Sequence, residues 1–168
     1  MKNTSLQYQI PQASWKLEIC SPVIDILSKH VQHSRLAKES VGQLYAKELT
    51  TDIIRIEAAT LLKPISARRT KVQFSPAQAM AERKNMHKQG FHCLGLWHSH
   101  PEPDPTPSYE DIQLAADYAL AAKAQLNGIV FAILGTSPFP SGLTIWVHDG
   151  KMLTQAVPFS AATRKFDK

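Results

Sequence analysis

The segment that begins at Trp97, WHSHPEPDPTPSYED, carries two histidines and an aspartate at spacings that suit a metal site. His98 and His100 are two residues apart, and residues two apart in an extended strand project from the same face, so both imidazoles can reach one ion. Asp111 falls in the first turn of a predicted helix, where its carboxylate can supply a third ligand. Three protein ligands leave a fourth position for water, as in catalytic zinc sites, whereas structural zinc sites are closed by four.

A stiff bridge of alternating prolines separates the histidines from Ser108 and Asp111. Each proline fixes its own φ and pushes the preceding residue toward extended geometry, so the bridge cannot be helical. It is expected to hold the strand end and the helix start at a fixed separation, which preorganises the ligands. Ser108 and Asp111 also form an S-x-x-D capping box, which explains those two residues without a metal but leaves the two histidines unexplained. The prolines are Pro101, Pro103, Pro105 and Pro107.

Helical and strand-like patterns alternate around this segment and predict an α+β fold with a mixed, mainly antiparallel sheet flanked by helices. Ser75-Pro76 and Gly90, for example, are typical of the start and the end of a helix. The predicted helices cover residues 21–32, 75–90 and 112–126. The predicted strands cover residues 42–49, 52–62, 72–74, 91–97, 128–135, 143–148 and 151–157, and the first two are expected to pair antiparallel.

Length and composition indicate a single domain over residues 1–168, with flexible termini at 1–14 and 160–168. No window approaches the roughly 18 apolar residues of a membrane span. The N-terminus lacks the apolar region of a secretion signal, so we expect a cytoplasmic protein. Trp97 is expected to pack in the core beneath the metal site.

Charge and cysteine usage narrow the function classes further. The net charge of +5 permits nucleic-acid binding, but no aromatic residues interleave with the clustered Lys and Arg, so nucleic acid is an unlikely partner. Cys20 and Cys93 lie far apart with no C-x-x-C pair, which argues against a thiolate zinc site. The zinc deaminases are excluded, because their H-x-E and P-C-x-x-C signature is absent.

The histidine segment resembles the signature of the JAB/JAMM metalloproteases, also called MPN-domain zinc peptidases. That signature is a Glu upstream of H-[ST]-H-x7-S-x-x-D, and the family often carries E-x-x-G-x-L at the start of a strand. The residues that match are Glu39, Gly42, Leu44, His98, Ser99, His100, Ser108 and Asp111. The resemblance covers roughly residues 15–155 and implies the JAB/MPN fold, which is cytidine-deaminase-like.

The resemblance also implies a cofactor and roles for the matching residues. It implies Zn²⁺ held by His98, His100 and Asp111, with Glu39 as general acid and base and Ser108 as a hydrogen-bond donor to the developing oxyanion. The chain is then a zinc metalloprotease of the deubiquitinase-like isopeptidase type. Other upstream acids that could serve as the base instead are Glu48, Asp52 and Glu57.

Two other classes remain open beside the active peptidase. One is a metal-free MPN scaffold that serves only as an interaction module, although such scaffolds usually lack part of the ligand set. The other is a DNA-repair-associated JAB domain of the RadC type, which shares H-x-H-P and P-S-x-x-D and is compatible with a basic chain. The helix before E-x-x-G-x-L and the Pro-Glu-Pro after His100 look more like the stand-alone prokaryotic JAB proteases.

Among those proteases, WHSHPEPDPTPS most resembles short JAB proteins of bacterial operons that also encode homologues of ubiquitin-activating and ubiquitin-conjugating enzymes, many of them antiphage (CBASS-like) systems. This likeness implies a protein substrate with an extended C-terminal tail, either a ubiquitin-like modifier or a cGAS-like nucleotidyltransferase, and leaves maturation of a sulfur-carrier precursor open. We expect the tail to add as a strand to the segment Leu62 to Phe74, which is basic at Arg68, Arg69 and Lys71.

Overall fold

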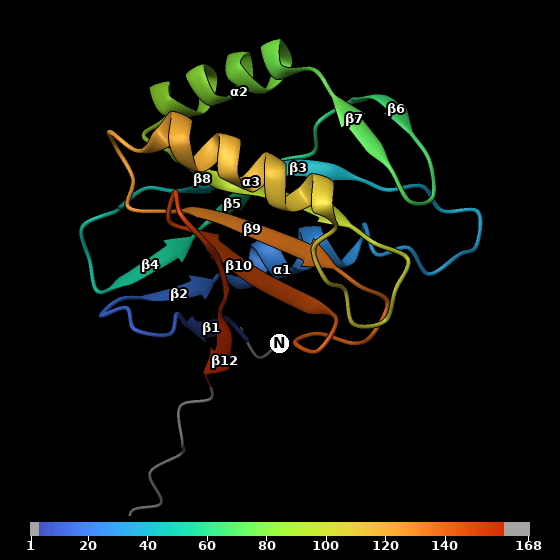
Figure 1. Ribbon diagram of the computed structural model, residues 1–168, viewed down its shortest axis with the longest axis horizontal. Helices are drawn as coiled ribbons and strands as arrows, with labels where there is room; N and C mark the ends of the chain where they lie inside the picture. The colour runs from blue at the N-terminus through green and yellow to red at the C-terminus, as the bar shows by residue number, and fades with distance from the viewer. Residues whose placement is uncertain (1–3, 160–168) are drawn as a thin grey trace, which may run out of the picture.

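The computed structural model describes residues 4–159, and its architecture is α+β, which confirms the predicted fold class. Three helices accompany three sheets in this part of the chain (Figure 1). The helices are α1 (Ser21–Ser28), α2 (Pro76–Lys88) and α3 (Tyr109–Ala122). The strands are β1 (Leu6–Gln9), β2 (Lys16–Ile19), β3 (Val41–Ala46), β4 (Ile53–Ile56), β5 (Ala58–Ala59), β6 (Pro64–Ala67), β7 (Val72–Phe74), β8 (His92–Ser99), β9 (Ile129–Leu134), β10 (Leu143–His148), β11 (Leu153–Gln155) and β12 (Val157–Phe159).

A six-stranded sheet in the order β11-β10-β9-β8-β3-β5 forms the centre of the molecule. Its neighbouring strands are antiparallel except β8 and β9, which run parallel. Every residue of β9 is buried, and its alternate residues serve two cores: Phe131 and Ile133 pack with Ala115 of α3, while Val130 and Ala132 pack toward α1 and the second sheet. In Figure 1, α2 and α3 accordingly lie on one face of this sheet, and α1 with β1, β2 and β4 lies on the other.

The second sheet has the order β12-β1-β2-β4 and corrects the expectation of a flexible N-terminus. Residues 6–9 form its strand β1, in which Tyr8 is fully buried and its hydroxyl donates to the Leu143 carbonyl at 3.3 Å. Burying this tyrosine against the central sheet fixes the segment. The other predicted flexible end, 160–168, lies outside the described residues, as do residues 1–3.

The strand predicted over residues 52–62 is two strands in the structure, β4 in the four-stranded sheet and β5 in the six-stranded sheet. Only β5 pairs antiparallel with β3, whereas β4 pairs in parallel with β2. The predicted hairpin is therefore wrong for β4, because its inward residues Ile54 and Ile56 join the core next to Leu17 and Ile19.

The helix starts were predicted more accurately than the helix ends. Ser75 caps α2 by accepting a hydrogen bond from the Gln78 N–H at 3.3 Å, and Gly90 follows with φ +83°, as predicted. By contrast, α1 stops at Ser28 and α3 at Ala122, four residues short of the predicted ends in both cases. No helix within residues 4–159 is long and apolar enough to cross a bilayer.

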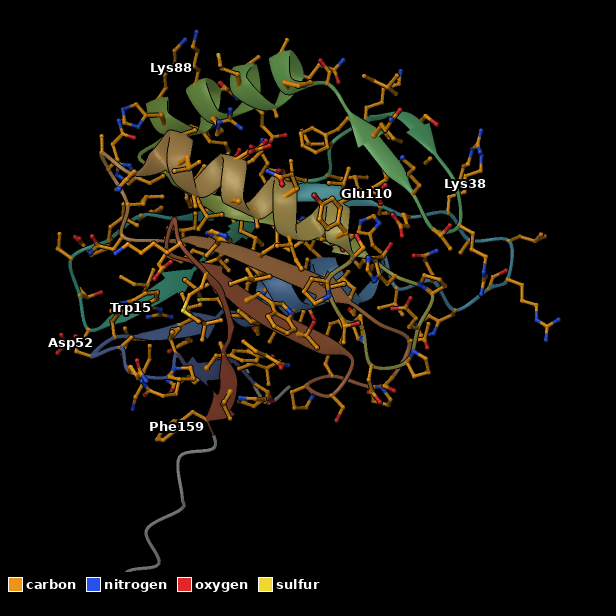
Figure 2. The ribbon with its side chains drawn as sticks, viewed as in Figure 1. Trp15, Lys38, Asp52, Lys88, Glu110 and Phe159 are labelled. Carbon is orange, nitrogen blue, oxygen red and sulfur yellow. The ribbon has the colours of Figure 1, made fainter. Side chains whose placement is uncertain are left out.

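A short hairpin, β6 and β7, stands apart from the two larger sheets beside the start of α3. The Lys71 ammonium in its turn lies 3.7 Å from the carboxylate of Glu110. Glu110, labelled in Figure 2, is in the first turn of α3. The hairpin therefore borders the same helix end that carries Asp111.

Candidate metal centre

The end of β8 delivers both histidines to one place. His98 is the penultimate residue of the strand, and the His100 N–H donates to the Leu134 carbonyl at 2.8 Å, which extends the pairing with β9 by one residue. Between them, Ser99 hydrogen bonds to Ser40 through both its N–H and its hydroxyl, at 3.0 and 2.9 Å. Extended geometry from 98 to 100 therefore points both imidazoles to the same side. The two bonds of Ser99 connect this strand end to Ser40, which follows Glu39 in the sequence.

The proline bridge is anchored to the turn between β9 and β10. The carbonyls of Glu102 and Pro103 accept the N–H groups of Thr136 and Ser137, at 2.9 and 3.2 Å. A Cβ on Gly135 would lie 2.4 Å from the Pro103 oxygen, so only glycine permits this close approach. The bridge is thus held against the sheet, and it brings the chain back to α3 with Asp111 facing the histidines.

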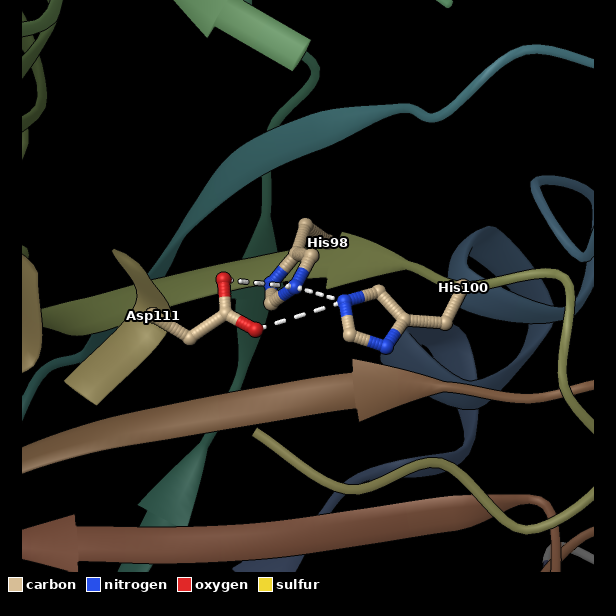
Figure 3. A group of neighbouring side chains, drawn as sticks. All are labelled: His98, His100 and Asp111. Atoms are coloured by element: carbon tan, nitrogen blue, oxygen red, sulfur yellow. Dashed lines mark hydrogen bonds and ion pairs between the residues drawn. The ribbon is translucent and has the colours of Figure 1, made fainter. Parts of the chain in front are cut away.

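The three predicted ligands meet as Figure 3 shows. The two Nε2 atoms of His98 and His100 are 2.7 Å apart. Asp111 reaches both rings, with its Oδ1 3.2 Å from the His98 Nε2 and its Oδ2 3.3 Å from the His100 Nε2. Within residues 4–159 this is the one group of at least three His, Cys, Asp and Glu side chains whose potential ligand atoms all lie within 4.8 Å of one another.

Burial and mutual contact shift the pKa values of this cluster strongly. Burial lowers the pKa of His98. Burial also acts to lower the pKa of His100, but the hydrogen bond and the charge of Asp111 outweigh it, so the pKa of His100 is raised. Burial acts to raise the pKa of Asp111, but its hydrogen bonds to the two imidazoles outweigh this and hold it far below its usual range. Asp111 is therefore a carboxylate, ready to act as an anionic ligand.

Ser108 and Asp111 form the predicted capping box at the start of α3. The Ser108 N–H donates to the Asp111 Oδ2 at 2.7 Å, and the Asp111 N–H donates to the Ser108 hydroxyl at 3.1 Å. The cap fixes the carboxylate and, because the hydroxyl only accepts in it, leaves the hydroxyl proton for another acceptor. Ser108 also lines the cavity described next.

Glu39 lines the same cavity as the three ligands, a cavity of about 210 Å³, and it precedes β3, the strand that pairs with β8. Its side chain is only 6% exposed, and burial raises the pKa of its carboxyl from 4.5 to about 7, while the His100 charge acts in the opposite direction. Glu48, Asp52 and Glu57 do not line this cavity, and Figure 2 shows Asp52 at the left edge of the molecule, away from Glu110. Among the upstream acids, only Glu39 is placed to exchange a proton with a molecule at the metal site.

The β6–β7 hairpin closes one side of the cavity. Lys71, Val72 and Phe74 line it, together with Thr70. The Glu39 N–H donates to the Arg68 carbonyl at 2.8 Å, so the hairpin turn also positions the start of β3. Within the described residues, β7 pairs only with β6, which leaves its second edge without a strand partner.

Two residues around the cluster add detail to the sequence interpretation. Glu102 was not predicted, yet its Oε2 lies 3.3 Å from the His100 Nδ1 and can orient the ring. Its position two residues after His100 was the available signal, although residues 101–104 form a bend and not the extended segment that the prolines predicted. Trp97 is fully buried, and its indole N–H donates to the Thr60 carbonyl at 2.8 Å, which confirms its predicted place in the core.

These donors fit a zinc ion. Zinc in catalytic sites takes three protein ligands, such as three imidazoles or two imidazoles and a carboxylate, and keeps one position open. Here two Nε2 atoms and a carboxylate converge at the wall of a cavity. A second carboxylate behind His100 is the usual outer partner of a metal-bound imidazole.

The fold and this cluster together define a JAB-type domain with a His-His-Asp group that can hold a metal. Residues 21–148 match the family of prokaryotic homologs of the JAB domain, and the chain belongs to that family. Among curated proteins, none is similar enough in sequence to count as a relative.

Solved structures show the same fold at low sequence identity. A protein of Desulfitobacterium hafniense, known from its solution structure, superposes with a TM-score of 0.61 at 19% identity, over 82% of this chain and 87% of that one. A protein of Salinibacter ruber superposes with a TM-score of 0.52 at 16% identity, over 87% of this chain and 92% of that one. At these identities the likeness concerns the fold alone.

Proposed function

We propose that the chain is a zinc-dependent peptidase of the isopeptidase type, which cleaves the bond after the extended C-terminal tail of a protein substrate. The observation that carries this proposal is the convergence of His98, His100 and Asp111 at a cavity that Glu39 also lines. Membership of the JAB family supports it. A metal-free scaffold has no need of three converging ligands, nor of the Glu102 carboxylate that orients the His100 ring. We therefore place the scaffold alternative second.

In the proposed reaction, His98, His100 and Asp111 hold the zinc. When bound, zinc supplies a Lewis acid that polarises the scissile carbonyl and makes water a nucleophile near neutral pH. Glu39 accepts a proton from the attacking water and delivers it to the leaving nitrogen as the C–N bond breaks, so the proton count balances. The Ser108 hydroxyl donates to the developing oxyanion, a contact worth about 3 kcal/mol in comparable sites.

The free edge of β7 supports the proposed mode of substrate binding. A tail that adds as a strand beside Val72 and Phe74 runs along the cavity wall toward the ligands, and its backbone satisfies the open edge. This strand lies within the segment Leu62 to Phe74, where the sequence predicts that the tail adds. A ubiquitin-like modifier or a cGAS-like nucleotidyltransferase is the substrate class we propose, within a cytoplasmic antiphage system.

The test is zinc-dependent cleavage of a defined conjugate. Purified protein is incubated with a ubiquitin-like protein joined through its C-terminus to a lysine of a second protein, and with a short unrelated peptide. We expect cleavage of the conjugate at the junction, loss of cleavage with a chelator and in His98→Ala, and little cleavage of the peptide. Rapid hydrolysis of the unrelated peptide would contradict the isopeptidase assignment, and no zinc-dependent hydrolysis of either would favour the scaffold.

A further inference from the structure

Basic side chains gather on one side of the cavity, on two segments far apart in the sequence. One is the loop of residues 31–40 after α1, and the other is the arm of residues 62–74 that contains the β6–β7 hairpin. Glu39 is the only acid in the two segments, and it is buried in the cavity. We call their exposed cations the basic surface: Arg35, Lys38, Lys63, Arg68, Arg69 and Lys71.

Hydrogen bonds join the loop and the arm into one surface. The buried Gln32 side chain donates to the Ala37 carbonyl at 3.1 Å and to the Arg69 carbonyl at 2.9 Å. The Arg69 guanidinium in turn donates to the Arg35 carbonyl at 2.8 Å. These bonds hold the loop against the turn of the hairpin, and the bond from the Glu39 N–H to the Arg68 carbonyl continues this contact to the cavity.

Most of these charges are not neutralised by the chain itself. Among the described residues, Lys71 alone of the six has an ion pair, with Glu110, and both side chains of that pair are exposed. The Arg69 guanidinium binds carbonyls, not carboxylates. An anionic face of a partner would relieve this crowding of like charge.

Two exposed aliphatic side chains lie among the cations. Leu36 on the loop is 90% exposed, and Ile65 on the arm is 70% exposed. Placed on segments that hydrogen bond to each other, they offer apolar contact area within a charged rim, which is the usual composition of a protein interface.

We propose that the basic surface binds an acidic face, with apolar side chains among its carboxylates, on the folded protein whose tail enters the cavity. This rests on the proposed function and adds the charge of the partner to it. A protein fits better than a nucleic acid for two reasons. Glu102 and Glu110 line the cavity together with Glu39 and Asp111, and these acids would repel a phosphate chain crossing the site. The exposed hydrophobic side chains of the two segments are the aliphatic Leu36 and Ile65, and their one aromatic, Phe74, is partly buried in the cavity wall, so no exposed ring is offered for bases to stack on.

The test measures binding without catalysis, so its outcome is independent of zinc and turnover. Three fluorescent probes are compared by anisotropy at low and high salt: a 16-residue peptide of alternating Glu and Leu interrupted by Gly, the same peptide with Gln for Glu, and a 16-nucleotide single-stranded DNA. We expect the acidic peptide to bind best, and its affinity to fall with salt.

Matched charge reversals locate the binding. Arg35→Glu with Lys38→Glu alters the basic surface, and Lys84→Glu with Lys88→Glu makes the same change of net charge on α2, where Lys88 lies away from Lys38 (Figure 2). The first pair should lower affinity for the acidic peptide about tenfold and the second should leave it nearly unchanged. Leu36→Ser should weaken binding of the acidic peptide that contains Leu. It should not weaken binding of an acidic peptide in which every Leu is replaced by Ser. Equal losses in both double variants, no binding, or a preference for the DNA would overturn the proposal, whether or not the peptidase function holds.

Discussion

The His100 ring is held from both sides, with its Nδ1 3.3 Å from the Glu102 carboxylate and its Nε2 3.3 Å from that of Asp111. Glu102 therefore favours the tautomer that has the proton on Nδ1 and a free Nε2 for a metal. Glu102→Gln should lower zinc affinity by about 10-fold to 100-fold, the usual effect of removing such an outer partner. Competition with a chromogenic chelator measures it, and Asp104→Asn, in the same loop, is the control. Equal affinities in all three proteins would show that Glu102 has no such role.

Glu39 is proposed to move protons without holding the metal. Glu39→Gln should keep zinc and lose at least about 100-fold in turnover, the scale of a general base. Glu48→Gln is a matched control, because that side chain is exposed and does not line the cavity. Loss of zinc with Glu39→Gln would make it a ligand, and retained activity would assign the proton transfer elsewhere.

Burial of Glu39 also has a cost in stability that depends on pH. Because its pKa is about 7 in the folded chain and near 4.5 when unfolded, the folded state binds the proton more tightly. The raised pKa therefore stabilises the folded state fully below pH 4.5, and this stabilisation is lost as the pH rises toward 7 and above. In the zinc-free protein, Glu39→Gln should therefore raise the free energy of unfolding by up to about 3 kcal/mol at pH 8, and by much less at pH 5. Urea unfolding at the two pH values measures it, and an equal change at both would contradict the raised pKa.

Arg68 and Arg69 support the proposed substrate binding from the hairpin turn. Replacing both by Ala keeps the Arg68 carbonyl that accepts the Glu39 N–H, so the base should stay in place. We expect KM for a defined conjugate to rise with kcat nearly unchanged, which is the signature of lost uniform binding. Steady-state kinetics measures this, with the double variant Lys84→Ala, Lys88→Ala on α2 as the control. An unaltered KM in the Arg68, Arg69 variant would place tail recognition elsewhere.

The parts of the fold that were predicted correctly are those determined by local sequence. Ser75-Pro76 set the start of α2 and the buried run of β8 set the strand that carries the histidines, since capping and hydrophobic pattern act within a few residues. His98, His100 and Asp111 could be grouped because strand periodicity and a stiff bridge constrain them directly.

Long-range pairing accounts for what the sequence did not reveal. Nothing local to β4 indicates that it pairs in parallel with β2, whose partner residues lie 37 positions earlier, and not with β3. The same holds for Tyr8, whose burial depends on Leu143 at the far end of the chain. α1 and α3 end four residues before their apolar patterns do, and Val31 and Leu126 still pack against the core from outside the helices, so the hydrophobic pattern alone did not fix the helix ends.

The most direct measurement of the central claim is the zinc content of the purified protein by elemental analysis, beside His98→Ala and Asp111→Ala. The proposed site predicts one zinc per chain in the natural protein and its loss in both variants, with Asp104→Asn as a control that keeps it. Natural protein that is free of metal and fails to take up added zinc, while remaining folded, would contradict the site and the function built on it.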